Sequence, residues 1–180
     1  MTAPTSAPPG ESTKSPEAMA AYLATFAREH ATTVRVLRAF PPEKAELRPH
    51  PKTKTARELA WIFVAEQRLL TTAITTGFDW SQPMGAPPGP PESFEAIVST
   101  FEVGGERVMQ LLRDLPPDRL DATVSFFVAP KTLGDIPMRD FLWFMLHDQI
   151  HHRGQFSIYL RMADAKVPSI YGPTADEPWT

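Results

Sequence analysis

The positions of the 20 prolines constrain the fold of this 180-residue chain more than any other feature of the sequence. Proline lacks a backbone N–H and clashes with the preceding helical turn, so helix interiors exclude it. The segments that carry proline leave four stretches with helical periodicity, at residues 15–40, 55–76, 93–115 and 137–163. The sequence therefore predicts an all-α fold. We expect a four-helix bundle with an irregular segment before the last helix and an extended C-terminal strap.

Local signals refine these boundaries. Thr55 and Glu58 have the spacing of a capping box, in which each side chain accepts a hydrogen bond from a free N–H of the first turn. Gly104 and Gly105 fall inside the third stretch, where each destabilises a helix by about 1 kcal/mol relative to alanine. They predict a kink or a close backbone approach. The run TVSFFV, residues 123–128, is rich in β-branched and aromatic residues and predicts a short extended segment.

Composition narrows the class of protein. The net charge of −3 and the pI of about 5.9 give no indication of a nucleic-acid partner. No run of about 18 apolar residues indicates a membrane span, and the N-terminal residues lack the apolar region of a secretory signal. We therefore expect a cytoplasmic protein. The first 14 residues are small, polar and rich in proline, and they predict a disordered tail before a single domain over residues 15–180.

Cysteine is absent. This excludes disulfides, zinc–thiolate clusters and a cysteine nucleophile. Histidine, aspartate and glutamate are left as the plausible metal ligands.

One carboxylate falls on an apolar helix face. Glu66 lies at the centre of a stripe formed by Leu59, Ile62, Phe63, Leu69, Leu70 and Ala73. A buried carboxylate is unfavourable unless it is protonated, paired or bound to a metal. Arg68, the nearest basic residue on the same helix, points to another face. Glu66 therefore needs a partner from another helix, which is either an arginine or a metal site.

The fourth helix carries three histidines in the stretch HDQIHHRGQ, residues 147–155. His147 and His151 have i, i+4 spacing, which allows two imidazoles on one face to meet a single metal ion. His152 lies about 100° away around the helix and is the poorer ligand. The sequence therefore predicts a metal site built from Glu66, His147 and His151. We expect their face of the helix to be buried, together with Trp143, Phe144, Ile150, Gly154 and Ile158.

A further histidine, His30, lies at the centre of the apolar stripe of the first helix. With a rise of about 1.5 Å per residue, His30 and Glu66 come to nearly the same height in an antiparallel helix pair. We therefore expect His30 to be a catalytic proton acceptor or a fourth ligand. The alternative is a satisfied core histidine, which is the more common role of a lone histidine on an apolar face.

The opposite face of the fourth helix is also apolar. It carries Leu142, Met145, Phe156 and Leu160. A helix that is apolar nearly all round is either central in a protein or part of a dimer interface. We therefore expect a homodimer.

The same residues carry a family resemblance. The segments FLWFMLHDQIHHRGQFSIYLRM and KVPSIYGPTADEP resemble the DinB-like (YfiT-related) superfamily of damage-inducible bundle proteins, most specifically in HDQIHHRGQ and PSIYGP. The resemblance implies an up-and-down-like four-helix bundle, often dimeric, with a divalent metal held by three histidines. Two of these correspond to His147 and His151. The second helix has no histidine for the third position, and Glu66 is the sensible substitute. Such a site suits zinc, nickel, iron or manganese.

The resemblance also implies a range of functions. Members of the superfamily include thiol-dependent S-transferases and isomerases, in which the metal lowers the pKa of a low-molecular-weight thiol. A detoxification or stress enzyme that acts on a small molecule is therefore the leading expectation. Two alternatives stay open: a metal-dependent hydrolase of a small substrate, and a non-catalytic dimeric stress-response or binding bundle.

Overall fold

Four helices occupy the four stretches that proline leaves free. The computed structural model describes residues 14–81 and 88–180. The predicted disordered tail, residues 1–14, lies outside these ranges except for Lys14, which begins α1. The helices are α1 (Lys14–Arg38), α2 (Ala56–Thr75), α3 (Phe94–Arg113) and α4 (Met138–Met162), and short 3-10 turns at Pro42–Lys44 (η1) and Pro117–Leu120 (η2) follow α1 and α3. Each helix matches its predicted stretch to within a few residues.

The predicted capping box starts α2. The Thr55 hydroxyl accepts a hydrogen bond from the Glu58 N–H at 3.1 Å, and the Glu58 carboxylate accepts one from the Thr55 N–H at 2.7 Å. The helix ends next to Gly77, whose φ of +71° is a left-handed conformation that glycine adopts without strain. Both ends of α2 are therefore set by local sequence.

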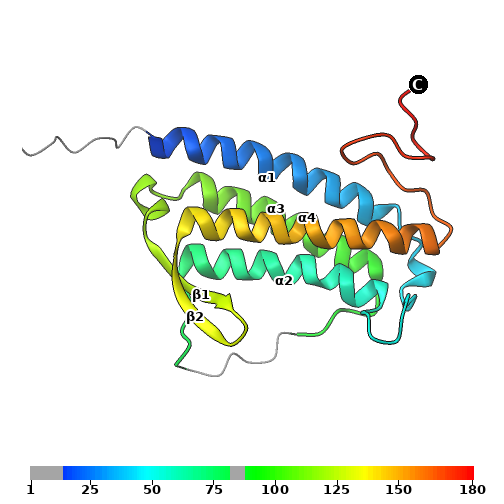
Figure 1. Ribbon diagram of the computed structural model, residues 1–180, viewed down its shortest axis with the longest axis horizontal. Coiled ribbons are helices and arrows are strands. Elements are labelled where there is room, and N and C mark those ends of the chain that lie inside the picture. Colours follow the sequence, from blue (N-terminus) through cyan, green and yellow to red (C-terminus); the bar gives the residue numbers. More distant parts are fainter. Residues whose placement is uncertain (1–13, 82–87) are drawn as a thin grey trace, which may run out of the picture.

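The helix directions follow from contacts between residues far apart in the chain. The Tyr22 hydroxyl donates to the Leu142 carbonyl at the start of α4, and Arg153 reaches Glu29 farther along both helices, so α1 and α4 run parallel. Gln67 bonds to Phe101, and Trp61 bonds to Pro88 just before α3, so α2 and α3 also run parallel (Figure 1). α3 therefore begins at the end of the bundle where α2 begins, which differs from the up-and-down order that the resemblance implies.

A β-hairpin stands where an irregular segment was predicted. β1 (Thr123–Ala129) and β2 (Thr132–Pro137) pair antiparallel, with Val124 opposite Ile136. The extended segment TVSFFV is confirmed as most of β1. The mostly helical class with four helices is confirmed, but the hairpin means that the fold is not purely α. β2 was not predicted because its residues show little alternation of apolar and polar side chains.

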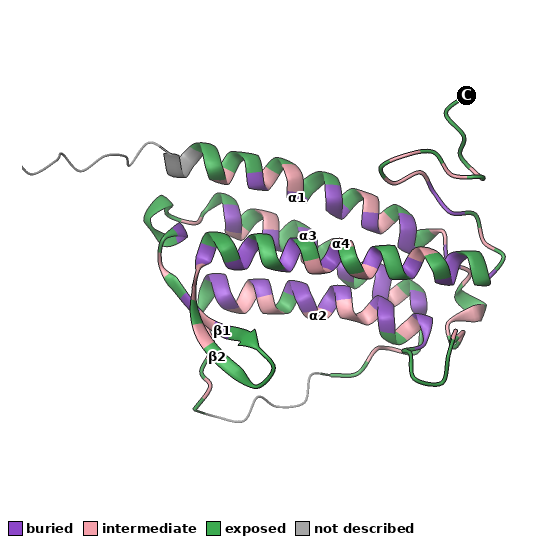
Figure 2. Ribbon diagram, in the orientation of Figure 1, coloured by how far each residue is buried: buried purple, intermediate pink, exposed green. Residues whose placement is uncertain are grey.

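Among the residues that the structure describes, the core consists of two apolar clusters at opposite ends of the bundle. One lies where α2 and α3 begin and α1 and α4 end, and the other lies at the end next to the hairpin. Between them the inward faces carry buried polar residues: Glu29, His30, Thr33, Glu66, Gln67, Gln149 and Arg153. We call these seven residues the polar layer. Buried and exposed residues alternate along each helix in Figure 2. In the part of the chain that the structure describes, no helix is long and apolar enough to cross a membrane.

The two glycines of α3 permit close packing onto this layer. α3 is continuous through both positions, so the predicted close approach is confirmed. A Cβ at Gly104 would collide with the side-chain amide of Gln67, and one at Gly105 would collide with the ring of His30. Glycine at these positions therefore lets two polar side chains enter the interior against α3.

Candidate metal centre

Glu66 is buried in the polar layer on the side of α2 that faces α4. The residue is 3% exposed. Its Oε1 lies 2.8 Å from Nδ1 of His152, while its buried Oε2 has no hydrogen-bond partner in the described part of the chain. Burial raises the pKa of Glu66 to about 7, although the hydrogen bond with His152 opposes this shift. The prediction that Glu66 is buried and needs a partner from another helix is confirmed.

Asp148 and His152 supply that partner from one face of α4. They have i, i+4 spacing, and Nδ1 of His152 lies 3.8 Å from Oδ1 of Asp148. One ligand atom from each of Glu66, Asp148 and His152 lies within 4.8 Å of the other two. The hydrogen bond with Glu66 raises the pKa of His152 against the effect of burial. The edge of the Phe63 ring packs on the imidazole, with centroids 6.3 Å apart. The three groups form a cluster across the α2–α4 interface.

The cluster fits a divalent ion by its chemistry. Two carboxylates and one imidazole are the donors that zinc, manganese, iron and nickel accept. The free Oε2 of Glu66 is a buried acceptor without a donor, a situation that native proteins usually resolve with a ligand or water. The side chains of His152 and Asp148 are 17% and 40% exposed, so the cluster is open on one side. A buried anchor with an open side is the arrangement of a metal site that can also receive a small molecule.

Of the three predicted ligands, only Glu66 belongs to this cluster. His147 and His151 are both on the exposed side of α4. The His147 ring lies 5.9 Å from that of Trp143, and Nε2 of His151 lies 2.9 Å from Nε2 of Gln155. The ring of His151 is 5.4 Å from that of His152, so it borders the cluster. Asp148 and His152, and not these two histidines, lie beside Glu66. A ligand role for His147 and His151 stays a prediction.

The prediction that the face of His147 and His151 is buried is wrong, and the reason lies in the rotation of α4. Trp143, Phe144 and Ile158 are exposed, whereas the residues assigned to the outward face, Leu142, Met145, Phe156 and Leu160, are in the core. The error is one residue, or about 100° of rotation. A second i, i+4 pair, Asp148 with His152, was present in the same stretch. This pair was not recognised because the inward face of α4 also carries the polar side chains of Gln149 and Arg153, so the face did not look buried.

His30 lies in the polar layer but outside the cluster. Its ring stacks parallel to Phe26 at 6.1 Å and lies 4.6 Å from the ring of Phe101. Its Nδ1 is buried and has no partner among the residues described, and burial lowers the pKa of His30. The structure thus confirms that His30 is buried at mid-height. A catalytic or ligand role for His30 stays a prediction.

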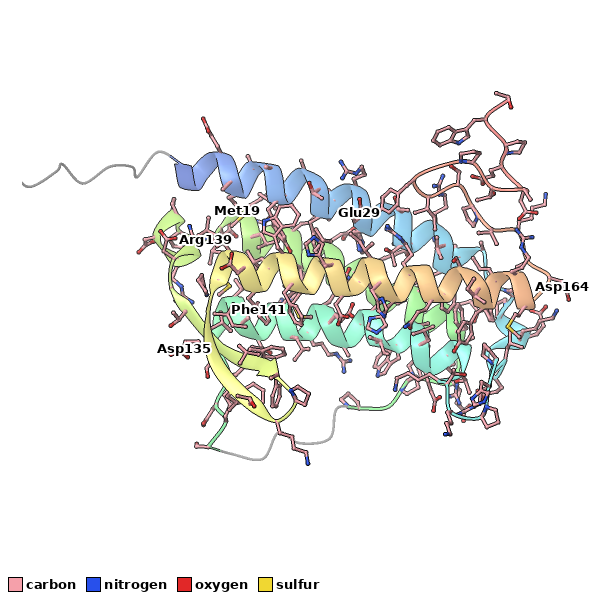
Figure 3. The ribbon with its side chains drawn as sticks, in the orientation of Figure 1. Met19, Glu29, Asp135, Arg139, Phe141 and Asp164 are labelled. Atoms are coloured by element: carbon pink, nitrogen blue, oxygen red, sulfur yellow. The ribbon has the colours of Figure 1, made fainter. Side chains whose placement is uncertain are left out.

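Sequence reasoning missed a buried ion pair that adjoins the cluster. Nη2 of Arg153 lies 2.7 Å from Oε2 of Glu29, and Nη1 donates to the Glu29 carbonyl at 3.1 Å. The Tyr171 hydroxyl donates to the same Glu29 oxygen at 2.7 Å from the C-terminal segment. Glu29 is labelled midway along α1 in Figure 3. The ion pair joins α4 to α1 at Arg153, the residue that follows His152. The predicted strap therefore has a defined contact in PSIYGP, the motif that contains Tyr171.

Comparison with known proteins places the chain in a family. Residues 12–179 match the model of the DinB family. An uncharacterized protein of Bacillus subtilis (strain 168), YrdA, is 26% identical over 157 residues, which cover 87% of this chain and 89% of that protein.

Two solved structures share the fold. A DinB-like protein from Bacillus cereus ATCC 10987 superposes with a TM-score of 0.69 at 22% identity, covering 83% of this chain and 95% of that one. The DinB-like protein YjoA from Bacillus subtilis gives 0.65 at 16% identity, covering 88% and 99%. The mostly helical fold and the match over nearly the whole sequence agree, and the chain belongs to the DinB family.

Proposed function

We propose that this protein binds a divalent metal ion through Glu66, Asp148 and His152. The observation that carries the proposal is the buried Oε2 of Glu66, which has no partner in the described chain and lies in a cluster with two further ligand side chains. The cost of burying a carboxylate supports the same assignment, because a cation offsets it directly.

Each side chain has a distinct part in the proposed site. Glu66 is the rigid anchor, because α2 and α4 enclose it. His152 is oriented by its hydrogen bond to Glu66 and by the edge of Phe63. Asp148, the most exposed of the three, leaves room for a small molecule. When bound, the ion would supply a Lewis acid that lowers the pKa of a thiol or hydroxyl group held next to it.

The reaction class that we propose is transfer to or from a low-molecular-weight thiol, as the family resemblance suggests. The chain has no cysteine, so a thiol nucleophile has to come from a second substrate. Turnover of small electrophiles by the metal-loaded protein is expected to require an added thiol. Turnover that proceeds equally without a thiol would contradict the transferase and favour a hydrolase.

Metal content of the purified protein tests the site itself. Elemental analysis after purification without chelators is expected to find about one divalent ion per chain, and calorimetric titration of the stripped protein is expected to give a single site. Glu66→Gln keeps the shape of the side chain and removes its charge. This variant and Asp148→Asn should lower the metal affinity by at least about 100-fold. Loss of a residue that only hydrogen-bonds to a metal ligand already lowers the affinity about 10- to 100-fold.

Histidine variants on the exposed side of α4 are the matched controls. His147→Gln and His151→Gln should retain the ion, whereas His152→Gln should lose it. If His147→Gln and His151→Gln abolish binding and Asp148→Asn does not, the ligand set predicted from the sequence replaces the one proposed here. If the wild-type chain binds no divalent ion, the proposal fails.

A further inference from the structure

A groove between α2 and α3 lies on a different side of α2 from the metal cluster. Its volume is about 290 Å³. The residues that line it include Gln67 and Arg68 on α2 and Thr100, Gly104 and Arg107 on α3. α2 and α3 run side by side and parallel (Figure 1). Glu66 faces α4 while its neighbour Gln67 faces α3. Successive residues of one helix therefore serve two separate sites.

The floor of the groove holds an unpaired acceptor. Gln67 is 3% exposed, and its Nε2 donates to the Phe101 carbonyl at 2.9 Å. This bond fixes which end of the amide is the donor, and it leaves Oε1 buried without a partner in the described part of the chain. A buried amide oxygen is unfavourable without a donor. A donor that enters the groove would satisfy it.

The missing side chain at Gly104 leaves the space that this oxygen occupies. A Cβ at that position would collide with Oε1 of Gln67. Mid-helix glycine is destabilising relative to alanine, and here the missing side chain makes space for a polar atom at the floor of a groove. The glycine and the unpaired oxygen therefore meet at one point on the floor of the groove.

Two arginines flank the groove from opposite walls. Arg68 is on α2 and Arg107 is on α3, and both are exposed. Neither forms an ion pair with another described residue. The Arg68 guanidinium is held over the Trp61 ring, 4.8 Å from its centroid, and Trp61 is itself tied to the Pro88 carbonyl. In a chain of net charge −3, two unpaired guanidinium groups around one groove favour an anion.

We propose that this groove binds a small organic anion, a carboxylate or a phosphate ester, that also carries an N–H or O–H group. The anionic group pairs with Arg68 and Arg107, and the donor bonds to Oε1 of Gln67. The Thr100 hydroxyl, which already donates to the Ala96 carbonyl, is available there as an acceptor. The volume limits the ligand to the small end of the range that protein pockets accept. The site is independent of the metal cluster and of its proposed reaction.

Probe molecules that separate the two halves of the ligand test this proposal. The full-length protein is titrated at constant ionic strength, and backbone amide shifts of α2 and α3 are followed by NMR. N-acetylglycine and glycerol 3-phosphate carry both an anion and a donor, acetate and methyl phosphate carry only the anion at a pH well above about 6, where a phosphate monoester is a dianion, and N-methylacetamide lacks charge. We expect at least one bifunctional probe to bind at residues 67–72 and 100–107, about tenfold tighter than its matched anion, as one added hydrogen bond implies.

Variants identify the contributing side chains. Arg107→Met should weaken binding of the bifunctional probe by about tenfold or more, because a charge-assisted bond is lost. Arg113→Met, farther along the exposed side of α3, is the matched control and should leave binding unchanged. Gln67→Met should reduce the affinity to that of the anion alone. Two results overturn the proposal: no saturable shift with either bifunctional probe, or equal binding by Arg107→Met and Arg113→Met.

Discussion

Arg153 and Glu29 form a buried ion pair, in which Nη2 of the arginine lies 2.7 Å from Oε2 of the glutamate. Arg153 is 1% exposed. The Tyr171 ring packs against its guanidinium, which lies 5.2 Å from the ring centroid. The pair fixes the rotation of α4 against α1. Because His152 precedes Arg153, this rotation also decides that Asp148 and His152, and not His147 and His151, face Glu66.

Removing the guanidinium should therefore destabilise the fold. Arg153→Met leaves the buried Glu29 carboxylate with only the Tyr171 hydroxyl and the exposed Arg28 guanidinium as partners, and breaking a buried pair in this way costs about 3–5 kcal/mol. Urea denaturation monitored by circular dichroism measures the change in the free energy of unfolding. Arg161→Met is the matched control, because Arg161 pairs with Asp176 near the surface and such pairs contribute about 0–1 kcal/mol. Equal losses for the two variants would contradict the assigned role of Arg153.

The same pair predicts how stability depends on pH. Burial by itself raises the pKa of Glu29, but the hydrogen bonds from Tyr171 and Arg153 outweigh it and hold the pKa below the ordinary value of 4.5. A lowered pKa means that the folded state binds the proton less readily than the unfolded state. The stabilisation is present above pH 4.5 and is lost as the pH falls through the lowered pKa. Denaturation curves at a series of acidic pH values should show a steeper loss for the wild type than for Glu29→Gln, and parallel curves would refute the prediction.

Local signals in the sequence were sufficient for most of the fold. Capping residues and prolines set the helix ends to within a few residues, and the periodicity of α2 placed Glu66 inside. The helix directions were beyond local reasoning, because the contacts that fix them, such as Gln67 with Phe101, join residues far apart in the chain. The second strand, β2, was missed for another reason: it pairs with β1 across a short turn, but its residues show little alternation of apolar and polar side chains.

The hydrophobic pattern of the sequence does not predict the rotation of α4, on which the site depends. The exposed side of α4 carries Trp143 and Ile158, and its buried side carries Gln149 and Arg153. Hydrophobicity therefore does not distinguish the two sides of α4. Only the partners on other helices, Glu29 for Arg153 and Glu66 for His152, decide between them.

Metal removal should lower the thermal stability of the wild-type protein. An ion that binds only the folded state at 100 times its dissociation constant adds about 2.7 kcal/mol to the free energy of unfolding. Differential scanning calorimetry of the metal-loaded and stripped forms measures this difference as a shift in Tm. At the same metal concentration Glu66→Gln should keep at most a small part of this shift, because its affinity is lower by at least about 100-fold. Glu106→Gln, which alters an exposed carboxylate on α3, should keep the full shift. A metal-dependent shift that survives in full in Glu66→Gln would exclude Glu66 as a ligand.

Gly105→Ala should destabilise the protein through His30. The added Cβ would collide with the imidazole ring, and overpacking a core costs about 1–3 kcal/mol. The loss should be much smaller in a His30→Ala background, where the methyl group has room. A double-mutant cycle in urea measures this coupling. Additive losses would show that Gly105 is required for a reason other than the histidine.

The homodimer stays a prediction, and the structure moves it to the opposite side of α4. The face first assigned to a partner is in the core, while the other side exposes apolar residues that include Trp143, Phe144, Ile158 and Met162. On that side a Cβ at Gly154 would meet no described atom within 4 Å, so the described part of the chain gives no packing reason for the glycine. A second copy that approaches α4 closely would give one.

Sedimentation velocity should find a dimer for the wild type and a monomer for Ile158→Glu, since a charge in the centre of an apolar interface opposes association. Val103→Glu places the same charge at a 67% exposed position on α3 and should remain dimeric. A wild-type chain that stays monomeric at all accessible concentrations would rule out this use of the face.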